Sequence, residues 1–381
     1  MENTWKTFNS SGDKRVIVTK KLPGDKWLDI LTRANCRVEV CTSKDILSNE
    51  EIKSAIGERC NGVIGQLTED WNNSLFQSLK SAGGQVYSNY AVGYDNVSVD
   101  AASNQNIAVG NTPGVLTETT AEMAATLTFA VARRVVEADD FMRNGNYNGW
   151  LPTLFLGHQL WGKTVGVIGA GRIGSTYARM MVQGHQMNLI YYDIYRNQQL
   201  EKDVTAFSKY LESRGEGSVW WKRAGSVEEV LSESDVLSLH PVLNEKTFHL
   251  ITAERLAMMK DDAILINVSR GPVIDESALV KHCEEHPDFR AGLDVFEDEP
   301  EMQPGLNELE NVTIVPHIAS ATTWTREGMA ILAARNVAGI LSGYPAWDAE
   351  DIQPFLEDDP PQAAPSIINA EAAGVPIYSG D

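Results

Sequence analysis

An apolar run that passes directly into a glycine-rich turn, VGVIGAGRIGS at 165–175, constrains the fold of this chain more than any other feature. Gly169 allows the tight turn from strand to helix, Gly171 lets backbone N–H groups approach a pyrophosphate, and Gly174 lets the helix pack closely on the strand. The positive N-terminus of that helix would face the phosphates. The pattern therefore predicts a dinucleotide-binding turn.

A carboxylate at the end of the next predicted strand supports this interpretation. The apolar run Met187–Tyr192 ends in Asp193, roughly 20 residues after the last glycine, where a carboxylate accepts hydrogen bonds from the adenosine ribose of NAD. Because a carboxylate repels a 2′-phosphate, we expect NADH to be preferred over NADPH. Arg196 lies a short distance further on. In NADP enzymes such an arginine can bind the 2′-phosphate, but here we expect its side chain to be solvated.

Length and composition limit the class of protein. A chain of 381 residues predicts about two to three domains, and 43% hydrophobic with 22% charged residues is typical of a globular protein. A formal net charge of −20 disfavours nucleic acids and anionic membranes as partners. No apolar run reaches the roughly 18 residues of a membrane span, and the first residues lack the apolar segment of a signal peptide. We therefore expect a cytoplasmic protein.

The cysteines, Cys36, Cys41, Cys60 and Cys283, are scattered along the chain without a CxxC pair. Neither a disulfide framework nor a metal site is predicted, and we expect these thiols to be small core residues.

Apolar runs alternate with helix-compatible segments along most of the chain, which predicts an α/β fold with doubly wound parallel sheets. The strand candidates before the glycine-rich turn are 15–19, 37–41, 62–67, 85–90 and 107–109, and those after it are 187–192, 235–239, 263–268, 290–295 and 312–315. Long helical patterns cover 119–143 and 323–341, and a cluster of Gly, Asn and aromatic residues at 144–150 would form an arm. The tail after 341 is rich in Pro, Ala and acidic residues, and its order stays open.

Three charged side chains follow strand candidates of the second domain: Arg270 follows ILINVS, Glu299 follows AGLDVF by a few residues, and His317 follows VTIVP. Because ligands of open α/β sheets bind beyond the carboxyl ends of the strands, we expect the three to converge. Arg270 would hold a substrate carboxylate and polarise its carbonyl group. A protonated His317 would donate a proton as hydride arrives at carbon, and Glu299 would favour the charged imidazole. Reduction of a 2-oxo acid requires these three functions.

Each of these residues has a structural alternative. His317 could be a core histidine and Arg270 a surface ion-pair residue, although positions at strand ends favour catalysis. Glu299 lies in an acidic run, and such runs are usually solvated. Asp294, within the apolar segment LDVF, could cap a turn or could accept a hydrogen bond from the amide of a nicotinamide ring.

At these residues the chain resembles the D-isomer-specific 2-hydroxyacid dehydrogenases, and within that family the plant-type hydroxypyruvate reductases. The matching segments extend along nearly the whole chain: GVIGQLTEDW, AVGYDNV, NTPGVLTETTAEMA, VGVIGAGRIGS, LSLHPVL, DAILINVSRGPVIDE, GLDVFEDEP, VPHIASATTWTREGMA and PSIINAEAAGVPI. The resemblance implies two Rossmann-like domains, a cofactor domain and a discontinuous, flavodoxin-like substrate domain, with boundaries at 1–120, 121–317 and 318–381. The helix near Thr119 would enter the cofactor domain, and the helix from Thr323 would return to the substrate domain.

The resemblance also implies site residues and partners. Arg270, Glu299 and His317 would be catalytic, and the backbone of Val92 and Gly93, with Arg270, would bind the substrate. Contacts with the NAD cofactor are implied at Gly169, Gly171, Arg172, Ile173, Gly174, Asp193, His240, Pro241, Val268, Ser269, Arg270, Asp294, Ala319 and Ser320. No metal is implied. A homodimer built through the cofactor domains and the arm at 144–150 is expected.

The implied reaction is the NADH-dependent reduction of hydroxypyruvate to D-glycerate, and of glyoxylate to glycolate, as in photorespiration. One feature departs from the plant members, which end in a peroxisomal tripeptide of the Ser-Lys-Leu type, whereas this sequence ends in Tyr378-Ser379-Gly380-Asp381. This departure favours the cytoplasm, with a peroxisome or another organelle reached by another route as the alternative.

Other activities on the same fold stay open. A D-3-phosphoglycerate dehydrogenase would need additional basic residues for the phosphate, and this acidic chain offers little sign of them. A formate dehydrogenase would carry an amide at the position of Glu299, because no proton transfer is then needed. A non-enzymatic, NAD-sensing corepressor could retain the fold and the three charged residues, but it would show negligible turnover of hydroxypyruvate.

Overall fold

The structure is a computed structural model that describes residues 4–349 and 351–378. It divides into two compact units, which we treat separately. The central unit comprises Thr117–Ser320, and the split unit comprises the residues up to Leu116 together with those from Ala321 onward. The expectations that rest on the first three residues and on Ser379–Asp381 lie outside the described residues.

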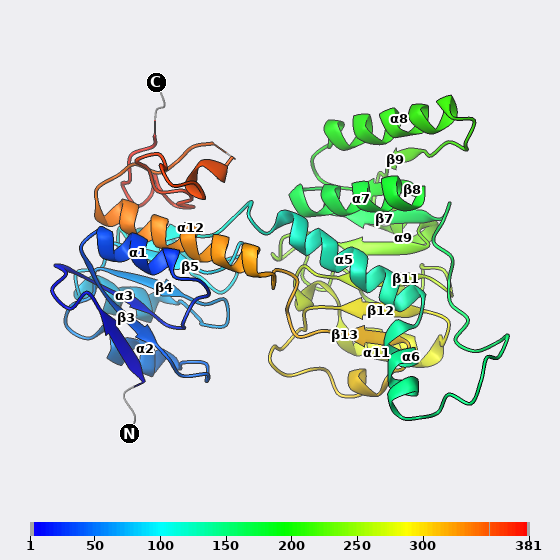
Figure 1. Ribbon diagram of the computed structural model, residues 1–381, viewed down its shortest axis with the longest axis horizontal. Helices are drawn as coiled ribbons and strands as arrows, with labels where there is room; N and C mark the ends of the chain where they lie inside the picture. The colour runs from blue at the N-terminus through cyan, green and yellow to red at the C-terminus, as the bar shows by residue number, and fades with distance from the viewer. Residues whose placement is uncertain (1–3, 350, 379–381) are drawn as a thin grey trace. The chain divides into compact units, whose positions relative to one another are not determined.

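A seven-stranded parallel sheet forms the middle of the central unit (Figure 1). Its strands are β7 (Thr164–Ile168), β8 (Asn188–Tyr192), β9 (Trp221–Arg223), β10 (Val236–Leu239), β11 (Ile264–Asn267), β12 (Arg290–Leu293) and β13 (Val312–Ile314). They lie in the order β13-β12-β11-β10-β7-β8-β9. The chain therefore starts at β7 and winds outward in both directions, and the order reverses between β7 and β10, which is the dinucleotide-binding arrangement. The predicted doubly wound fold is confirmed.

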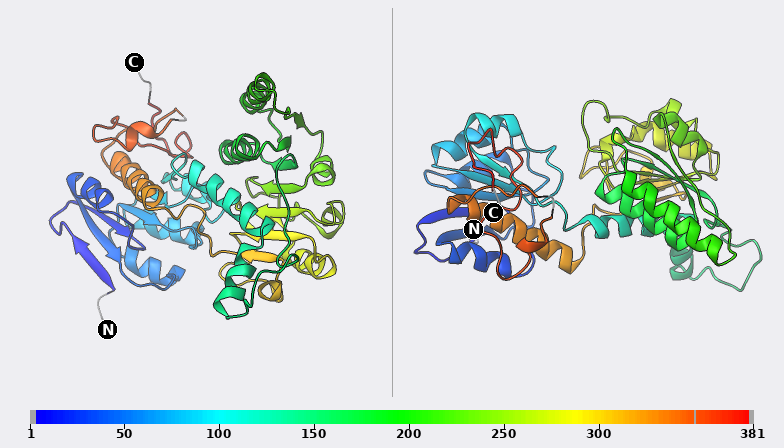
Figure 2. Two further views of the ribbon diagram at one scale, coloured as in Figure 1. Left: turned by 45° about the vertical axis from the view of Figure 1, so that its right-hand side comes forward. Right: turned by 90° about the horizontal axis from the view of Figure 1, so that it is seen from above.

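Helices cover both faces of this sheet (Figure 2). They are α5 (Thr117–Ala132), α6 (Val135–Arg143), α7 (Arg172–His185), α8 (Gln198–Ser213), α9 (Val227–Glu233), α10 (Ala253–Leu256) and α11 (Glu276–Glu285), with short 3-10 helices η1 (Gly271–Val273) and η2 (Leu306–Glu308). The alanine-rich α5 packs with α7 and α8 on one face, against side chains such as Val165 and Val167. α9, α10 and α11 pack on the other face, against Ile168 and Leu237. Successive residues along the strands thus point into two separate hydrophobic cores, one on each face of the sheet.

One expected helix is interrupted. The pattern over 119–143 predicted a single helix, but α5 and α6 are separated at Arg134, which has a φ of +53°. This left-handed conformation ends the first helix. Arg134 Nε donates to Glu137 (3.0 Å), and Glu137 also pairs with the buried Arg290 of β12 (2.9 Å). The interruption is therefore stabilised by a long-range contact that no local pattern reveals.

The split unit has a six-stranded sheet in the order β1-β3-β2-β4-β5-β6. Its strands are β1 (Trp5–Phe8), β2 (Lys14–Val18), β3 (Cys36–Cys41), β4 (Gly62–Gly65), β5 (Val86–Asn89) and β6 (Ala108–Gly110). The last five are parallel and have the flavodoxin-like order, whereas β1 pairs antiparallel with β3 at the edge. β1 was not predicted. It is short and half exposed, so it lacks the apolar run that marks a buried strand.

The helices of the split unit are α1 (Lys26–Arg33), α2 (Asn49–Ile56), α3 (Asn73–Ser81), α4 (Val99–Asn104) and α12 (Thr323–Leu341), followed by the 3-10 helix η3 (Gln353–Phe355). α2, α3 and α4 share one core with the sheet. α12 packs against α1 and against β4, β5 and β6. Its range matches the helical pattern predicted from Thr323 to Leu341.

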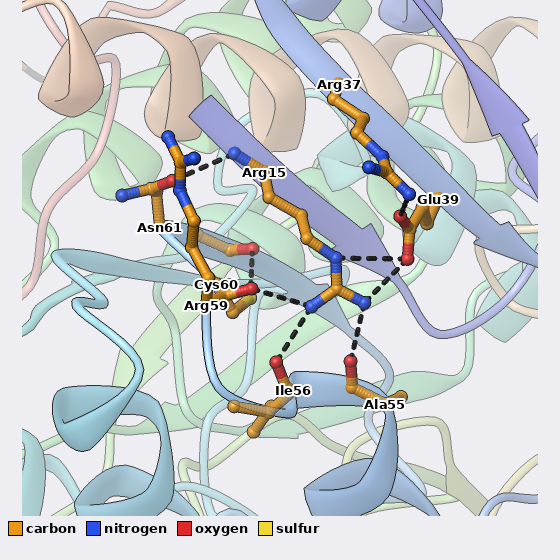
Figure 3. A network of polar contacts seen from close by, with 9 residues as sticks. Arg15, Arg37, Glu39, Ala55, Ile56, Arg59, Cys60 and Asn61 are labelled. Carbon is orange, nitrogen blue, oxygen red and sulfur yellow. Dashed lines mark hydrogen bonds and ion pairs between the residues drawn. The ribbon is translucent and has the colours of Figure 1, made fainter. Parts of the chain in front are cut away.

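An arginine on β2 joins two strands to the end of α2 (Figure 3). Arg15 donates hydrogen bonds to the carbonyl oxygens of Ala55 (2.8 Å) and Ile56 (2.7 Å). Its Nη2 also contacts Glu39 of β3 at 2.6 Å, and Arg37 pairs with the other carboxylate oxygen. Because the last carbonyl groups of a helix have no partner within it, this guanidinium completes the C-terminus of α2.

The tail, whose order the sequence left open, packs within the split unit. Ala346 forms isolated bridges with Ala364 and Ile377. Asn369 accepts a hydrogen bond from Val109 N (2.8 Å), and the side chain of Phe355 is fully buried. The tail thus adds to the core of the split unit.

All four cysteines are buried and unpaired, as expected. Across residues 4–349 and 351–378, no helix has both the length and the apolar character that a bilayer span requires.

Candidate active site

The glycine-rich turn lies between β7 and α7, where the strand order of the central unit reverses. Gly169 has a φ of +89°, and a Cβ atom there would lie 2.6 Å from the carbonyl carbon of His240. A Cβ atom on Gly174 would lie 2.0 Å from the carbonyl oxygen of Gly169, whereas the space beside Gly171 is open. There is therefore no room for a side chain at Gly169 and Gly174, where strand and helix pack, whereas the space beside Gly171 is available to a ligand.

The N-terminus of α7 has no side-chain cap. Gly171 precedes the helix, and Arg172 and Ile173 begin it. Because the first N–H groups of a helix have no partner within it, they can donate to an anion, and the helix dipole favours negative charge there. This uncapped end, beside the open face of Gly171, fits the pyrophosphate of a dinucleotide.

The end of β8 carries the predicted ribose carboxylate. Asp193 Oδ1 accepts a hydrogen bond from Tyr195 N (2.9 Å). Further along the same turn, Asn197 donates through Nδ2 to the carbonyl oxygen of Ala170 (2.7 Å), so this turn is joined directly to the glycine-rich turn. Arg196 is half exposed but not simply solvated, because it pairs with Glu201 at 2.8 Å.

His240 and Pro241 follow β10 on the other side of the strand-order reversal. His240 Nε2 lies 2.9 Å from the hydroxyl of Ser238, and its ring contacts that of Tyr177. Burial lowers the pKa of His240 to about 3, so its imidazole is neutral. The Tyr177 hydroxyl lies 2.9 Å from that of Thr128 in α5. These buried polar contacts hold the loop that begins with His240 and Pro241.

Arg270 lies directly after β11, in a loop that an asparagine organises. Asn267, the last residue of β11, donates to the carbonyl oxygen of Arg270 (2.9 Å) and accepts from the backbone N–H of Ser269 (3.0 Å). Val268 is buried, and Ser269 and Arg270 are partly exposed. Arg270 Nη1 also donates to the carbonyl oxygen of Ser269 at 2.8 Å. The guanidinium is thus presented at the carboxyl end of the sheet.

Glu299 and His317 come together at the same end of the sheet. His317 Nδ1 lies 2.9 Å from Glu299 Oε2, and the other carboxylate oxygen accepts the N–H of Phe296 (3.0 Å). Each side chain is 25% exposed. Nδ1 is assigned a proton because it faces the carboxylate, so Nε2 is the nitrogen left for a substrate. Among the residues that the structure describes, Nε2 forms no hydrogen bond.

The charges around Glu299 favour its ionised form. Burial alone would raise the pKa of Glu299, but the hydrogen bond and the charge of His317 outweigh it, and Phe296 N–H and the charge of Arg270 act in the same direction. The net effect is that the pKa of Glu299 is lowered. The charge of Arg270 thus acts at the Glu299 carboxylate, in the same direction as that of His317.

His317 has a φ of +50°, which residues with a side chain rarely adopt. Hydrogen bonds accepted by Asp294 stabilise this backbone conformation. Asp294 accepts His317 N–H through its carbonyl oxygen (2.9 Å), and its fully buried carboxylate accepts from Ile318 N (2.6 Å) and Ala319 N (2.9 Å). Burial raises the pKa of Asp294, although these two N–H groups oppose the rise. Asp294 therefore caps the loop from His317 to Ser320.

A second histidine–carboxylate cluster, which the sequence analysis missed, supports the Glu299 loop. His249 Nε2 lies 2.6 Å from Glu297 Oε1. The buried Glu276, at the start of α11, accepts the N–H of Glu297 at 2.8 Å. Burial raises the pKa of Glu276 to about 7, against the opposing effect of N–H groups from Glu297 and Gln303. Glu276 thus joins both ends of the segment that carries Glu299. In the sequence, the only local feature that could point to Glu276 is that it is a carboxylate at the start of a helix.

Val92 and Gly93 lie in the split unit, directly after β5. Their carbonyl oxygens accept hydrogen bonds from Asn111 (2.8 Å) and Asn89 (2.9 Å). Within 4–349 and 351–378, neither Val92 N–H nor Gly93 N–H donates to another residue. Two backbone donors are thus available for an anion. The same described ranges hold no group of three His, Cys, Asp or Glu side chains placed to bind a metal.

Comparison with known proteins identifies the family. Residues 125–319 match the family model described as the D-isomer specific 2-hydroxyacid dehydrogenase, NAD binding domain. The chain is 60% identical to a peroxisomal glycerate dehydrogenase of Arabidopsis thaliana, over 97% of each chain. This chain belongs to the D-isomer-specific 2-hydroxyacid dehydrogenases. It is therefore an NAD-dependent oxidoreductase.

More distant relatives agree with this assignment. A glyoxylate reductase of Thermococcus gammatolerans is 39% identical over 86% of this chain and 93% of its own length. The crystal structure of a Thermus thermophilus protein is similar with a TM-score of 0.75 and 37% identity, over 86% of this chain and 97% of the other. The match to the NAD binding domain lies within the central unit, which also carries Arg270, Glu299 and His317.

Proposed function

We propose that the protein reduces hydroxypyruvate to D-glycerate with NADH, and glyoxylate to glycolate by the same chemistry. The observation that carries the proposal is the 2.9 Å contact between His317 and Glu299 beside the charge of Arg270. An imidazole with a fixed anionic partner can donate a proton, and a neighbouring guanidinium can bind a carboxylate. The names of the relatives, a glycerate dehydrogenase and a glyoxylate reductase, support these substrates.

The three residues have different roles in this reaction. Arg270 binds the carboxylate of the 2-oxo acid and polarises its carbonyl group. His317 donates the proton on Nε2 to the carbonyl oxygen, and Glu299 stabilises the imidazolium before that transfer. NADH, when bound, supplies the hydride that reduces the neighbouring carbon. Hydride and proton together convert the carbonyl group to an alcohol, with no other reactant.

The residues that would hold NAD surround the reversal of strand order. The backbone of Gly169, Gly171, Arg172, Ile173 and Gly174 binds the pyrophosphate, and Asp193 binds the adenosine ribose. The loops that contain His240 and Pro241, Val268 to Arg270, Asp294, and Ala319 and Ser320 line the nicotinamide end. The Asp193 carboxylate repels a 2′-phosphate, which gives NADH its advantage. In the split unit, the N–H groups of Val92 and Gly93 bind the substrate carboxylate.

Steady-state kinetics of the full chain test the proposal. Hydroxypyruvate, glyoxylate and 3-phosphohydroxypyruvate are compared, each with NADH and with NADPH. We expect kcat/KM to be highest for hydroxypyruvate, and NADH to exceed NADPH by at least about tenfold. A preference for the phosphorylated substrate would indicate a phosphoglycerate dehydrogenase. Binding of NADH without turnover of any 2-oxo acid would indicate the corepressor.

We also propose a homodimer that buries α6 and the arm after it. None of the α6 residues is buried, and large apolar side chains are exposed from α6 through the arm at 144–150 and the segment after it, as far as Trp161. They are Val135, Val136, Met142, Tyr147, Trp150, Leu151, Leu156 and Trp161. Exposed apolar side chains gathered in one stretch of the chain in this way favour an interface.

The compartment is a further part of the proposal. Four free, buried thiols suit a reducing environment, which the cytoplasm expected from the sequence provides. The peroxisome is the alternative, because the Arabidopsis relative is described as peroxisomal. Cell fractionation with catalase as the peroxisomal marker distinguishes the two.

A further inference from the structure

An arginine at the end of β8 is held by a buried carboxylate. Arg196 Nε lies 3.0 Å from both oxygens of Glu201, and its Nη2 lies 2.8 Å from Oε2. Glu201 is only 4% exposed, and the hydroxyl of the fully buried Tyr191 donates to its Oε1 at 2.6 Å. The hydrogen bonds from Arg196 are the largest reason that the pKa of Glu201 is lowered. The carboxylate is therefore ionised and directs the guanidinium toward α8.

This pair belongs to the turn that carries the ribose carboxylate. Arg196 and Asp193 lie in the same short segment between β8 and α8. Asn197, the next residue, bonds to Ala170 in the glycine-rich turn (2.7 Å) and caps α8 through Leu200 N (2.9 Å). The end of the segment next to Arg196 is thus fixed to the glycine-rich turn. An arginine here is close to the place where a Rossmann domain distinguishes a ribose hydroxyl from a 2′-phosphate.

The charge of Arg196 is neutralised by its partner. A free guanidinium would form a bidentate, charge-assisted contact with a 2′-phosphate. In this chain Nε and Nη2 of Arg196 already donate to Glu201, and the pair has no net charge. The outer side of the pair borders a groove of about 550 Å³, which Lys202, Lys209 and Trp221 also line. A released arginine side chain therefore has room to move.

We propose that Glu201 is a specificity-determining residue that keeps Arg196 away from the 2′ position of the cofactor. It acts together with Asp193: one carboxylate repels the 2′-phosphate, and the other holds an arginine of the same segment that could bind it. The proposal rests on the NAD binding and the NADH preference of the proposed function.

Dissociation constants of NADH and NADPH, measured by isothermal titration calorimetry without substrate, test this role. Glu201→Gln keeps the side-chain shape and an acceptor for Tyr191, but it releases the charge of Arg196. We expect NADPH to bind on the order of tenfold more tightly in this variant, the size of one charge-assisted hydrogen bond, while NADH affinity changes by less than about threefold. Adding Arg196→Gln should abolish the gain.

A matched control removes the same charge from another pair in the central unit. Arg214 and Glu216 are paired at 2.8 Å beyond the C-terminal end of α8, roughly 24 Å along that helix from its start. Glu216→Gln should leave NADPH affinity unchanged. An equal gain in this control would show that the global charge, and not the release of Arg196, is responsible, and would overturn the proposal.

The surface variant Arg196→Gln keeps the test decisive if Glu201→Gln does not fold. Since Arg196 is withheld from the cofactor, this variant should bind NADPH as weakly as the parent chain. Weaker NADPH binding in Arg196→Gln would show that Arg196 already reaches the 2′-phosphate. An unchanged NADPH affinity in folded Glu201→Gln would show that Glu201 does not keep Arg196 away from the phosphate. Either result overturns the proposal. Equal binding of NADH and NADPH by the parent chain would instead overturn the cofactor preference in the proposed function.

Discussion

Three histidines in the central unit show how the surroundings of one residue type decide its chemistry. His240 is kept neutral by burial, with a pKa of about 3, so it cannot donate a proton at neutral pH. His249 directs Nε2 at Glu297 and stacks on Phe248, with ring centroids 4.1 Å apart. In His317 the carboxylate contacts Nδ1, which leaves Nε2 for a substrate. Only this last arrangement, of the three, suits a proton donor.

At the same scale, the Glu299–His317 contact predicts a pH effect. Glu299→Gln removes the anion that stabilises the imidazolium but keeps an amide oxygen near Nδ1. Because reduction needs the protonated ring, the alkaline fall of kcat/KM for hydroxypyruvate should move to lower pH. The pH profile of the variant, compared with that of the parent chain, measures the shift.

Glu301→Gln is the matched control, since Glu301 lies exposed in the same acidic run. It should keep the parent profile. If Glu299→Gln also keeps it, Glu299 is only part of a solvated acidic segment and another residue sets the charge of the imidazole.

At the scale of elements, the strands were predictable where burial on both faces leaves a continuous apolar run. The run 263–268, for example, contains the whole of β11. β1 and β9 were missed because they are short and partly exposed, and the break between α5 and α6 depends on the pairing of Glu137 with Arg290. Tertiary contacts, which leave no local pattern, account for these differences.

The candidate site, like the fold, was predictable only in part. Arg270 and His317 could be predicted because each directly follows a strand of a parallel sheet, and their loops meet at one edge. Glu299 was predicted from its position in the acidic segment after β12. The residues that contact this segment could not be predicted from the sequence. Glu276 and His249 contact that segment from distant parts of the chain, so spacing alone could not associate them with it.

Glu276 makes a prediction about α11 and the loop it supports. Its pKa is raised from 4.5 to about 7, so the folded state binds a proton that the unfolded state releases. The stability that this carboxyl contributes is therefore lost as pH rises from about 4.5 through 7. In Glu276→Gln, the free energy of unfolding should depend less on pH between about 5 and 8. Urea denaturation at several pH values measures it.

Glu284→Gln provides the comparison, because Glu284 lies exposed on the same helix. This variant should follow the parent chain at every pH. If Glu276→Gln does so too, the carboxyl of Glu276 does not carry the buried proton.

At the scale of the whole molecule, the exposed apolar side chains of α6, the arm and the segment after it predict the oligomeric state. Trp150 is 78% exposed and Leu151 is 59% exposed. Light scattering should give twice the 41.9 kDa of one chain, and the double substitution Trp150→Asp and Leu151→Asp should give monomers. Ile194→Asp, at a 74% exposed position outside the arm, should stay dimeric. A parent chain that is already monomeric would contradict the homodimer.

The decisive test of the proposed mechanism is the rate of hydroxypyruvate reduction by NADH in His317→Ala, measured together with the dissociation constant of NADH. We expect kcat to fall on the order of 10²-fold or more, because the proton donor is lost, while the NADH dissociation constant stays within about threefold of the parent value. Near-normal kcat in a variant that binds NADH would contradict the assignment of His317 as the proton donor, and with it the mechanism.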